Sequence, residues 1–165
     1  MADGAAFRMT RKVDAPRDEA WRAFTERDRL MRWFGPAGFE MRAAAVDLRP
    51  DGVFHYCLAS ADGVSVWGKW TYRSLRPPEE FVAVVSFSDE RGGVTRHPMS
   101  PMWPLETLST IRFRPEGDDA TMIEVVWAPI NETPEERASF AAGHAEMRQG
   151  WGGTFDRLDA YLARV

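Results

Sequence analysis

The side chains that could carry out chemistry in this chain are few and scattered. Three histidines, His55, His97 and His144, and the single cysteine, Cys57, are the residues that could ligate a transition metal. His55 and Cys57 lie two positions apart and would share one face of a strand, but no second pair completes a zinc-binding spacing. We therefore expect no metal ion and no cofactor, and we interpret Cys57 as a small core residue.

Acid–base chemistry is harder to exclude than metal chemistry. His144 falls on an apolar stripe one turn before Met147, and a partly buried imidazole titrates near neutral pH. Tyr56, Arg148 and Glu106 are further polar groups that could reach a pocket. There is no Gly-x-Ser-x-Gly elbow, which argues against a serine nucleophile. The simpler interpretation of His144 is a structural histidine, so no catalytic residue is assigned.

Aromatic residues are the most unusual part of the composition. The chain has seven tryptophans: Trp21, Trp33, Trp67, Trp70, Trp103, Trp127 and Trp151. Most are expected in a large aromatic core. A pocket for a small molecule is also mostly apolar, with a few placed polar groups, so some of these rings could line a cavity.

The overall composition is that of a globular protein with one core. A length of 165 residues suits a single domain spanning 1–165, and 44% hydrophobic with 28% charged residues argues against disorder. The 21 basic residues are outnumbered by 25 acidic ones and form no stripe, so neither nucleic acid nor membrane is an expected partner. No signal-peptide or bilayer-spanning apolar run occurs, and we expect a cytoplasmic protein.

The first third of the chain predicts a strand and two short helices. Apolar and polar residues alternate over 7–13, which is typical of a strand with one buried face. Pro16 suits the first position of a helix that continues to about Glu26, and its apolar face carries Trp21 and Phe24. A second short helix is expected to end at Gly35-Pro36.

The middle of the chain predicts an antiparallel meander. Strand-forming segments from about Phe39 to Ala128 are separated by turn sequences at 50–52, 62–63, 77–78, 91–93 and 116–119. The segment from His97 to Pro104 contains three prolines and cannot be a regular central strand. We interpret it as a loop or lid, with an apolar cluster of Met99, Met102 and Trp103.

The C-terminal segment predicts one long amphipathic helix. Thr133 is the expected N-cap, followed by proline at the first helical position and by Glu136 as its capping-box partner. An apolar stripe then runs at helical spacing through Phe140, His144, Met147, Trp151, Phe155, Leu158, Leu162 and Val165.

Three glycines interrupt this segment without interrupting its stripe. Gly150, Gly152 and Gly153 should each cost roughly 1 kcal/mol relative to alanine inside a helix. We hypothesise that another element or a ligand approaches their backbone so closely that a Cβ would not fit, and that at least one of them borders a cavity mouth or a tightly packed short helix.

The order of these elements, together with several motifs, resembles the helix-grip fold of the START/Bet v 1-like (SRPBCC) superfamily. More narrowly it is similar to the family named after the C-terminal domain of the activator of Hsp90 ATPase. The motifs are Ala15-Pro16 with Trp21 and Phe24, Arg32-Trp33-Phe34, Trp67-Gly68-Lys69-Trp70, and Gly150-Trp151-Gly152-Gly153-Thr154 with Asp156, Leu158 and Tyr161-Leu162. The resemblance implies an α+β fold in which six or seven antiparallel strands curve around a long C-terminal helix and enclose a pocket.

The fold hosts carriers, receptors, enzymes and co-chaperone domains, so the resemblance leaves the function open. The sequence favours binding of a hydrophobic small molecule, such as a lipid, polyketide or aromatic metabolite, because it supplies apolar lining and no convergent charged set. A cyclase- or hydrolase-like enzyme and a chaperone regulator are the alternatives. In the activator, an additional domain also engages Hsp90, and this chain is not expected to contain that domain. No Hsp90 interaction is therefore expected. Whether the chain forms a homodimer is left open. The residues expected to line the pocket are Trp33, Tyr56, Trp70, Phe87, Met102, Trp103, Ile111, Trp127, His144, Met147 and Trp151.

Overall fold

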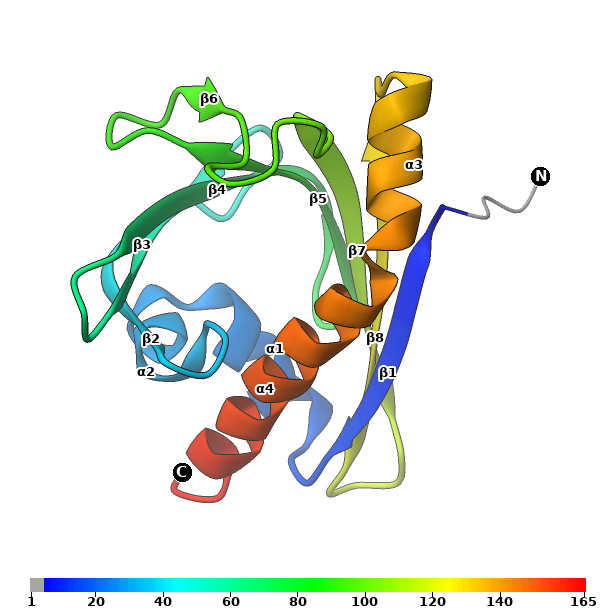
Figure 1. The fold of residues 1–165 in the computed structure, drawn as a ribbon. Coiled ribbons are helices and arrows are strands. Elements are labelled where there is room, and N and C mark those ends of the chain that lie inside the picture. Colours follow the sequence, from blue (N-terminus) through cyan, green and yellow to red (C-terminus); the bar gives the residue numbers. More distant parts are fainter. Residues whose placement is uncertain (1–4) are drawn as a thin grey trace.

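A strongly curled antiparallel sheet dominates the computed structural model, which describes residues 5–165 (Figure 1). The sheet has eight strands in the order β1-β8-β7-β5-β4-β3-β2, and β6 pairs with β5 beside this path. The strands are β1 (Phe7–Val13), β2 (Phe39–Val46), β3 (Val53–Ser60), β4 (Ser65–Arg76), β5 (Glu80–Ser88), β6 (Val94–Thr95), β7 (Glu106–Pro115) and β8 (Thr121–Ile130). The five expected turn segments all separate consecutive strands, as predicted.

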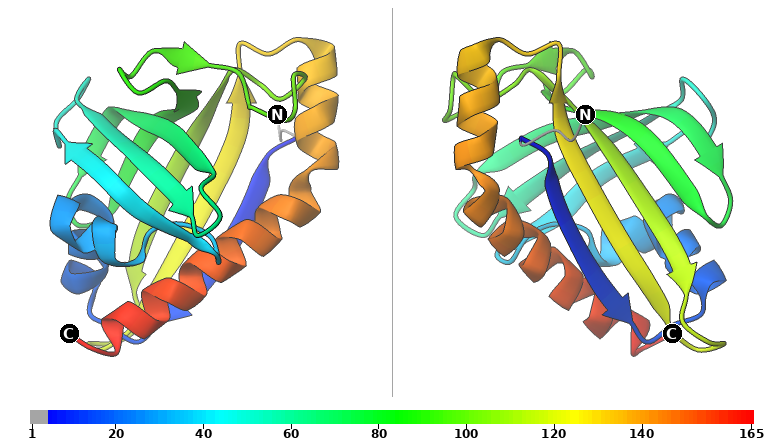
Figure 2. Two further views of the ribbon diagram at one scale, coloured as in Figure 1. Left: turned by 60° about the vertical axis from the view of Figure 1, so that its left-hand side comes forward. Right: turned by 90° about the vertical axis from the view of Figure 1, so that its right-hand side faces the viewer.

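The helices close the open side of the curled sheet. Helices α1 (Arg17–Thr25) and α2 (Arg27–Trp33) connect β1 to β2, and α3 (Pro134–Ala142) and α4 (His144–Leu162) follow β8. Helix α4 runs diagonally along the concave side of the sheet and past β1 (Figure 2). The expected α+β helix-grip fold is confirmed.

The first two helices form one aromatic unit with the sheet. Trp21 packs edge-on against Phe113, and Phe24 packs in the same way against both Phe113 and Trp33. The indole of Trp33 is fully buried and donates a hydrogen bond to the Ala23 carbonyl at 2.9 Å, which ties α2 to α1. This unit closes one end of the molecule. Different residues lie under the other half of the sheet.

The C-terminal helix is the element that the sequence predicted incorrectly. Its start is as expected, since Thr133 and Glu136 form a complete capping box with Pro134 in the first turn. The helix then breaks at Gly143 and continues as α4 in a new direction, which Figure 1 shows as a bend between the two orange segments. A Cβ at Gly143 would lie 3.0 Å from the Trp103 ring. The bend therefore occurs where a loop side chain lies against the backbone.

The close-approach hypothesis is wrong for Gly150, Gly152 and Gly153, although Gly150 does border a cavity, as expected of at least one of them. No atom lies within 4 Å of an ideal Cβ at Gly150 or Gly152, and at Gly153 the nearest atom is the Ala37 nitrogen at 3.5 Å, an ordinary contact. The stripe continues across these glycines because the helix is intact there. The space beside Gly150 and Gly152 is open, and no neighbouring element of the described chain packs there.

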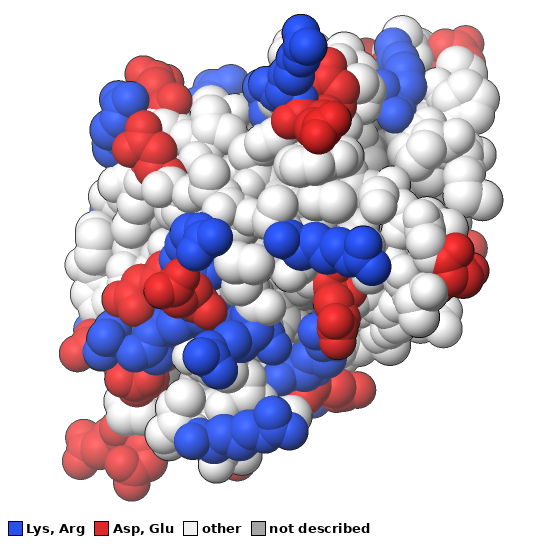
Figure 3. All heavy atoms as spheres, turned by 90° about the vertical axis from the view of Figure 1, so that its left-hand side faces the viewer, with Lys and Arg blue, Asp and Glu red and all other residues white. Residues whose placement is uncertain are grey.

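Charged side chains of both signs are interspersed over the face that carries β2 and β3 (Figure 3). Ion pairs between such side chains occur at helices α1 and α2, where Arg29 pairs with Glu19 and Glu26. Within residues 5–165, no helix combines the length and the apolar character needed to cross a lipid bilayer.

Candidate functional site

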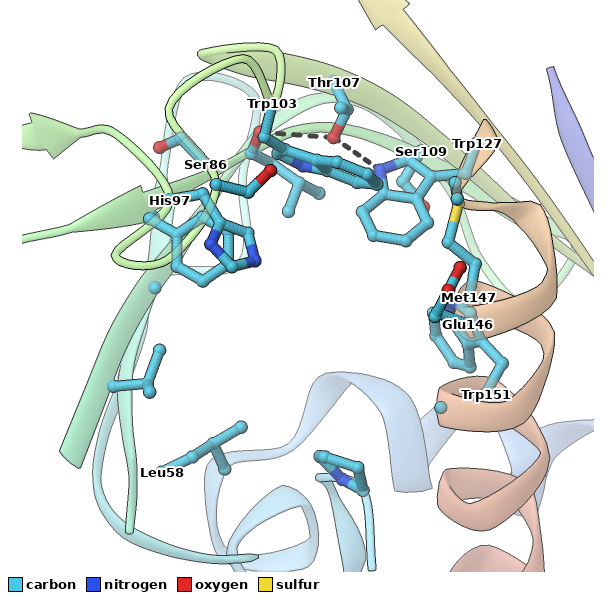
Figure 4. Close-up of a pocket in the computed structure, with 18 of the residues that line it drawn as sticks. Leu58, Ser86, His97, Trp103, Thr107, Ser109, Trp127, Glu146, Met147 and Trp151 are labelled. Atoms are coloured by element: carbon cyan, nitrogen blue, oxygen red, sulfur yellow. Dashed lines mark hydrogen bonds between the residues drawn. The ribbon is translucent and has the colours of Figure 1, made fainter. Parts of the chain in front are cut away.

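A cavity of about 640 Å³ lies between the concave side of the sheet and the two C-terminal helices. Strands β3, β4, β5, β7 and β8 form its roof, and the connection from Phe34 to Phe39 forms its floor. The loop from His97 to Leu105 and one side of α3 and α4 complete the wall. Figure 4 shows side chains from these elements arranged around an open centre. The volume is in the range of natural small-molecule sites.

The helical wall follows a regular spacing. Its members are Ser139, Ala142, Gly143, Glu146, Met147, Gly150, Trp151 and Thr154, which recur at intervals of three and one. This spacing marks one face of a helix, rotated relative to the apolar stripe seen in the sequence. Three of these residues are large, Glu146, Met147 and Trp151, and the other five are small. The small side chains are the reason that the space beside the helix stays open.

Aromatic rings supply most of the remaining wall. Phe34 packs edge-on against Trp70 at 5.3 Å and Tyr56 at 5.6 Å, and the Trp151 ring lies 6.5 Å from it. Trp103 lies across the cavity from this group, with its ring 6.3 Å from that of Trp127. Each ring is held by its neighbours, so the wall is formed before any ligand enters.

A small polar region lies on β7 within this apolar wall. The Trp127 indole N–H donates to the hydroxyl of Thr107, which in turn donates to the Val85 carbonyl at 3.3 Å. Ser109 lies next to Thr107 on the same face and pairs with Trp127 in register. No hydrogen bond to another described residue engages the Ser109 hydroxyl. It is free to bond a polar group of a ligand.

Tyr56 contributes a second polar atom to the wall. Burial raises the pKa of its phenol to about 12, against the opposing effect of a hydrogen bond with Trp70. The phenol is therefore neutral at physiological pH. It can act as a hydrogen-bond donor but is a weak candidate for a general base.

His97 is the histidine that does line the cavity. Its Nδ1 accepts a hydrogen bond from the Met99 N–H at 3.0 Å, and its ring lies 4.6 Å from the Phe87 ring. Desolvation lowers the pKa of His97, so the ring is neutral in the folded protein at neutral pH. With Nδ1 acting as an acceptor, the proton of the neutral ring resides on Nε2.

The structure brings together most of the residues that the sequence selected as pocket lining. Tyr56, Trp70, Phe87, Trp103, Trp127, Met147 and Trp151 all lie in the cavity wall. Trp33, Met102, Ile111 and His144 do not.

Each of these four residues has a different environment. Trp33 and Ile111 are fully buried in the aromatic core under α1 and α2. Met102 is 48% exposed. His144 Nε2 donates to the Ala5 carbonyl at 2.7 Å, and its ring packs against Phe7 and Phe140. His144 lies outside the cavity because its side chain projects from the side of α4 that packs on Phe7, next to the helix face that lines the cavity.

Sequence reasoning missed His97, Thr107, Ser109 and Glu146. For Ser109 a signal existed, since it alternates with Ile111 and Phe113 on a strand face expected to be buried. For Glu146 the signal was the run of small residues beside it, which marks a helix face next to empty space. The remaining candidates show no cavity role: Glu106 and Arg148 are not in the wall, and Cys57 is buried in β3.

No group of three or more His, Cys, Asp or Glu side chains with a metal-binding arrangement occurs between residues 5 and 165. His55 lies apart from the other two histidines, stacks on Trp67 at 4.9 Å and hydrogen-bonds the Asp89 carbonyl at 3.1 Å.

The sequence matches the model of one protein family over residues 14–163, nearly its whole length. That family is described as "Activator of Hsp90 ATPase homolog 1-like protein". The chain belongs to this family. A search of curated proteins found no significant match.

Several solved structures share the fold of this chain. A protein from Arthrobacter aurescens superposes with a TM-score of 0.79 at 20% identity, covering 98% of this chain and 88% of its own. A protein from Nitrosomonas europaea gives 0.75 at 21% identity, covering 99% and 97%. The AHSA1 protein from Silicibacter pomeroyi gives 0.72 at 15% identity, covering 96% and 97%. At these identities the likeness establishes the fold and not the ligand.

Proposed function

We propose that this protein binds a hydrophobic small molecule, such as a lipid, polyketide or aromatic metabolite, in the cavity beneath its sheet and does not transform it. The observation that carries the proposal is the helical wall, where Gly150 has open space on its side-chain side and the small residues Ser139 and Ala142 also line the cavity. Glycine costs helix stability, and here no neighbouring backbone requires it at Gly150. Space kept open at a cost in stability is expected of a binding site.

The polar groups of the cavity support binding more than catalysis. His144, the base considered for an enzyme, is bonded to a backbone carbonyl and lies outside the cavity. His97 and Tyr56 lie inside but are not bonded to a nucleophile or to a carboxylate that would orient them. A catalytic pair needs such mutual geometry. Hydroxyl and imidazole donors at the wall would instead orient one polar end of a bound molecule.

Titration with Nile red, a neutral environment-sensitive dye, tests this proposal. We expect saturable binding to the native protein and displacement by hydrophobic compounds. Gly150→Leu should weaken dye binding because its side chain would enter the cavity, whereas Gly152→Leu should not. Both positions have an open Cβ direction and lie in the same helix, so the pair separates cavity filling from general effects on α4. Equal dye binding by both variants, or no binding by the native protein, would contradict the proposal.

A further inference from the structure

The charged residues around the cavity say more about which ligand it would take than its apolar residues do. Within the described chain, Glu146 is the only Asp, Glu, Lys or Arg that lines the cavity. It projects from α4 between Met147 and Trp151 (Figure 4) and is exposed to solvent. The other titratable members of the wall, His97 and Tyr56, are neutral at physiological pH, as their pKa shifts require.

The cations that come near the wall are already engaged. Arg157 donates from Nη1 to the Gly35, Pro36 and Phe39 carbonyls, at 3.1, 3.4 and 2.5 Å. Arg96 pairs with Glu136 and bonds the Trp103 carbonyl at 3.3 Å. Neither guanidinium lines the cavity. A carboxylate inside would therefore lack a cationic partner, and burying an unpaired charge is costly.

The aromatic wall would attract a cation, in contrast to a carboxylate. Ring faces carry partial negative charge and attract cations placed within about 6 Å of the ring centre. Trp103, Trp127 and Trp151 contribute to the same cavity, and Trp151 lies beside Glu146 (Figure 4). A carboxylate beside aromatic faces is a favourable environment for an ammonium group attached to an apolar body.

From these observations we infer that the cavity selects its ligand by charge: it takes a hydrophobic molecule that carries an ammonium group, oriented toward Glu146, and rejects carboxylates of the same shape. This inference rests on the proposed function and narrows its ligand class. Fatty acids and aromatic acids are excluded as ligands. Neutral molecules of similar shape bind with intermediate affinity, because they lose the attraction without suffering the repulsion.

Three naphthalene compounds of matched shape test the inference by calorimetry at neutral pH: 2-naphthylmethylamine, 2-naphthylmethanol and 2-naphthoate. The native protein should bind the amine most tightly, the alcohol less tightly and the acid at least tenfold more weakly than the amine. Glu146→Gln should weaken amine binding about threefold, as expected for a partly exposed ion pair, and should affect the alcohol less than the amine. Glu146→Lys should reverse the order of amine and acid.

Glu116→Gln is the matched control. Glu116 is exposed in the turn between β7 and β8 and does not line the cavity, so removing its charge changes only the net charge of the protein. Amine binding should be unaffected by it. If the acid binds as well as the amine, or Glu146→Lys leaves their order unchanged, the charge inference is wrong while the binding function stands. If the alcohol and the amine both fail to bind, the proposed function fails with it.

Discussion

The phenol ring of Tyr56 on β3 lies directly over Gly68, its register partner on β4. A Cβ at Gly68 would lie 2.6 Å from the Tyr56 hydroxyl oxygen and 2.7 Å from Cζ, closer than non-bonded atoms can approach. Glycine at this position lets the ring lie flat against the sheet. The Trp67-Gly68-Lys69-Trp70 motif thus fixes the position of a cavity-wall side chain on the neighbouring strand.

Gly68→Ala should destabilise the protein, because the added methyl group displaces the Tyr56 ring from the sheet. The expected loss is about 1–3 kcal/mol, typical of overpacking a well-packed region. Urea unfolding followed by tryptophan fluorescence measures it.

Tyr56→Leu supplies the test of mechanism, because leucine lacks the atoms that clash. In the Tyr56→Leu background, Gly68→Ala should cost much less than in the native protein. Equal costs in both backgrounds would mean that the ring contact is not the reason for the glycine.

Gly150→Ala and Gly152→Ala should each stabilise the protein by about 0.5–1 kcal/mol, the difference in helix propensity between the two residues. Neither methyl group would meet a neighbouring atom within 4 Å. Thermal unfolding measures the effect, with Gly153→Ala expected to follow the same trend because its Cβ would make only an ordinary contact with Ala37. A lower melting temperature for Gly150→Ala would show that the space beside it is smaller than described.

Much of this fold follows from sequence patterns. Alternation over 7–13, the capping box at Thr133 and the turn sequences between strands are local signals, and each produced the expected element. The break at Gly143 could not be predicted in this way. At Gly143 the ring of Trp103, forty residues away in the sequence, lies so close to the backbone that an added Cβ would be only 3.0 Å from it. Contacts of this kind leave no periodic signal.

Wall residues could be predicted from the sequence where they lie on the buried face of a strand. Trp70 and Phe87 face inward with the core by strand alternation, so an aromatic pattern identifies them. His97 was missed because it lies in an irregular loop, whose path cannot be predicted from a periodic pattern. Glu146 was missed because a charged residue beside the apolar stripe is ordinarily assigned to the solvent-facing side of a helix. Ile111 and Trp33 show the converse: inward-facing residues can belong to a solid part of the core.

His97 should make stability depend on pH. Because burial lowers its pKa in the folded protein, the unfolded chain takes up a proton first as the pH falls below about 6.5. The contribution of His97 to the free energy of unfolding is therefore fully present above that pH. It decreases as the pH falls and stops decreasing once the pH is below the lowered pKa of the folded state. Protonation would also remove the acceptor for the Met99 N–H.

Urea midpoints of the native protein and of His97→Asn, compared from pH 7.5 down to pH 5.5, isolate this contribution. Asparagine offers an acceptor near the position of Nδ1 but does not titrate. His55 and His144 are present in both proteins, so their contributions cancel in the difference. Parallel curves for the two proteins would contradict the prediction.

Arg96 and Glu136 should be coupled, because their ion pair joins the loop before β7 to the first turn of α3. The pKa of Glu136 is lowered, first by the Thr133 N–H and then by Arg96, so its contribution is present above the usual glutamate pKa and is lost as the pH falls through the acid range. A double-mutant cycle with Arg96→Met and Glu136→Gln should give a coupling of about 1 kcal/mol at neutral pH. Repeated in acid, the cycle should give none. A coupling that is absent at neutral pH, or unchanged in acid, would contradict the pairing.

Native mass spectrometry of protein purified from its own host tests the central claim most directly. If the cavity is a binding site, the native protein and Gly152→Leu should both retain a molecule of defined added mass, and Gly150→Leu, whose new side chain would project into the cavity, should retain less of it. Equal retention of that mass by Gly150→Leu would place the molecule elsewhere. The absence of any retained molecule from the native protein, together with a flat Nile red titration, would contradict the account.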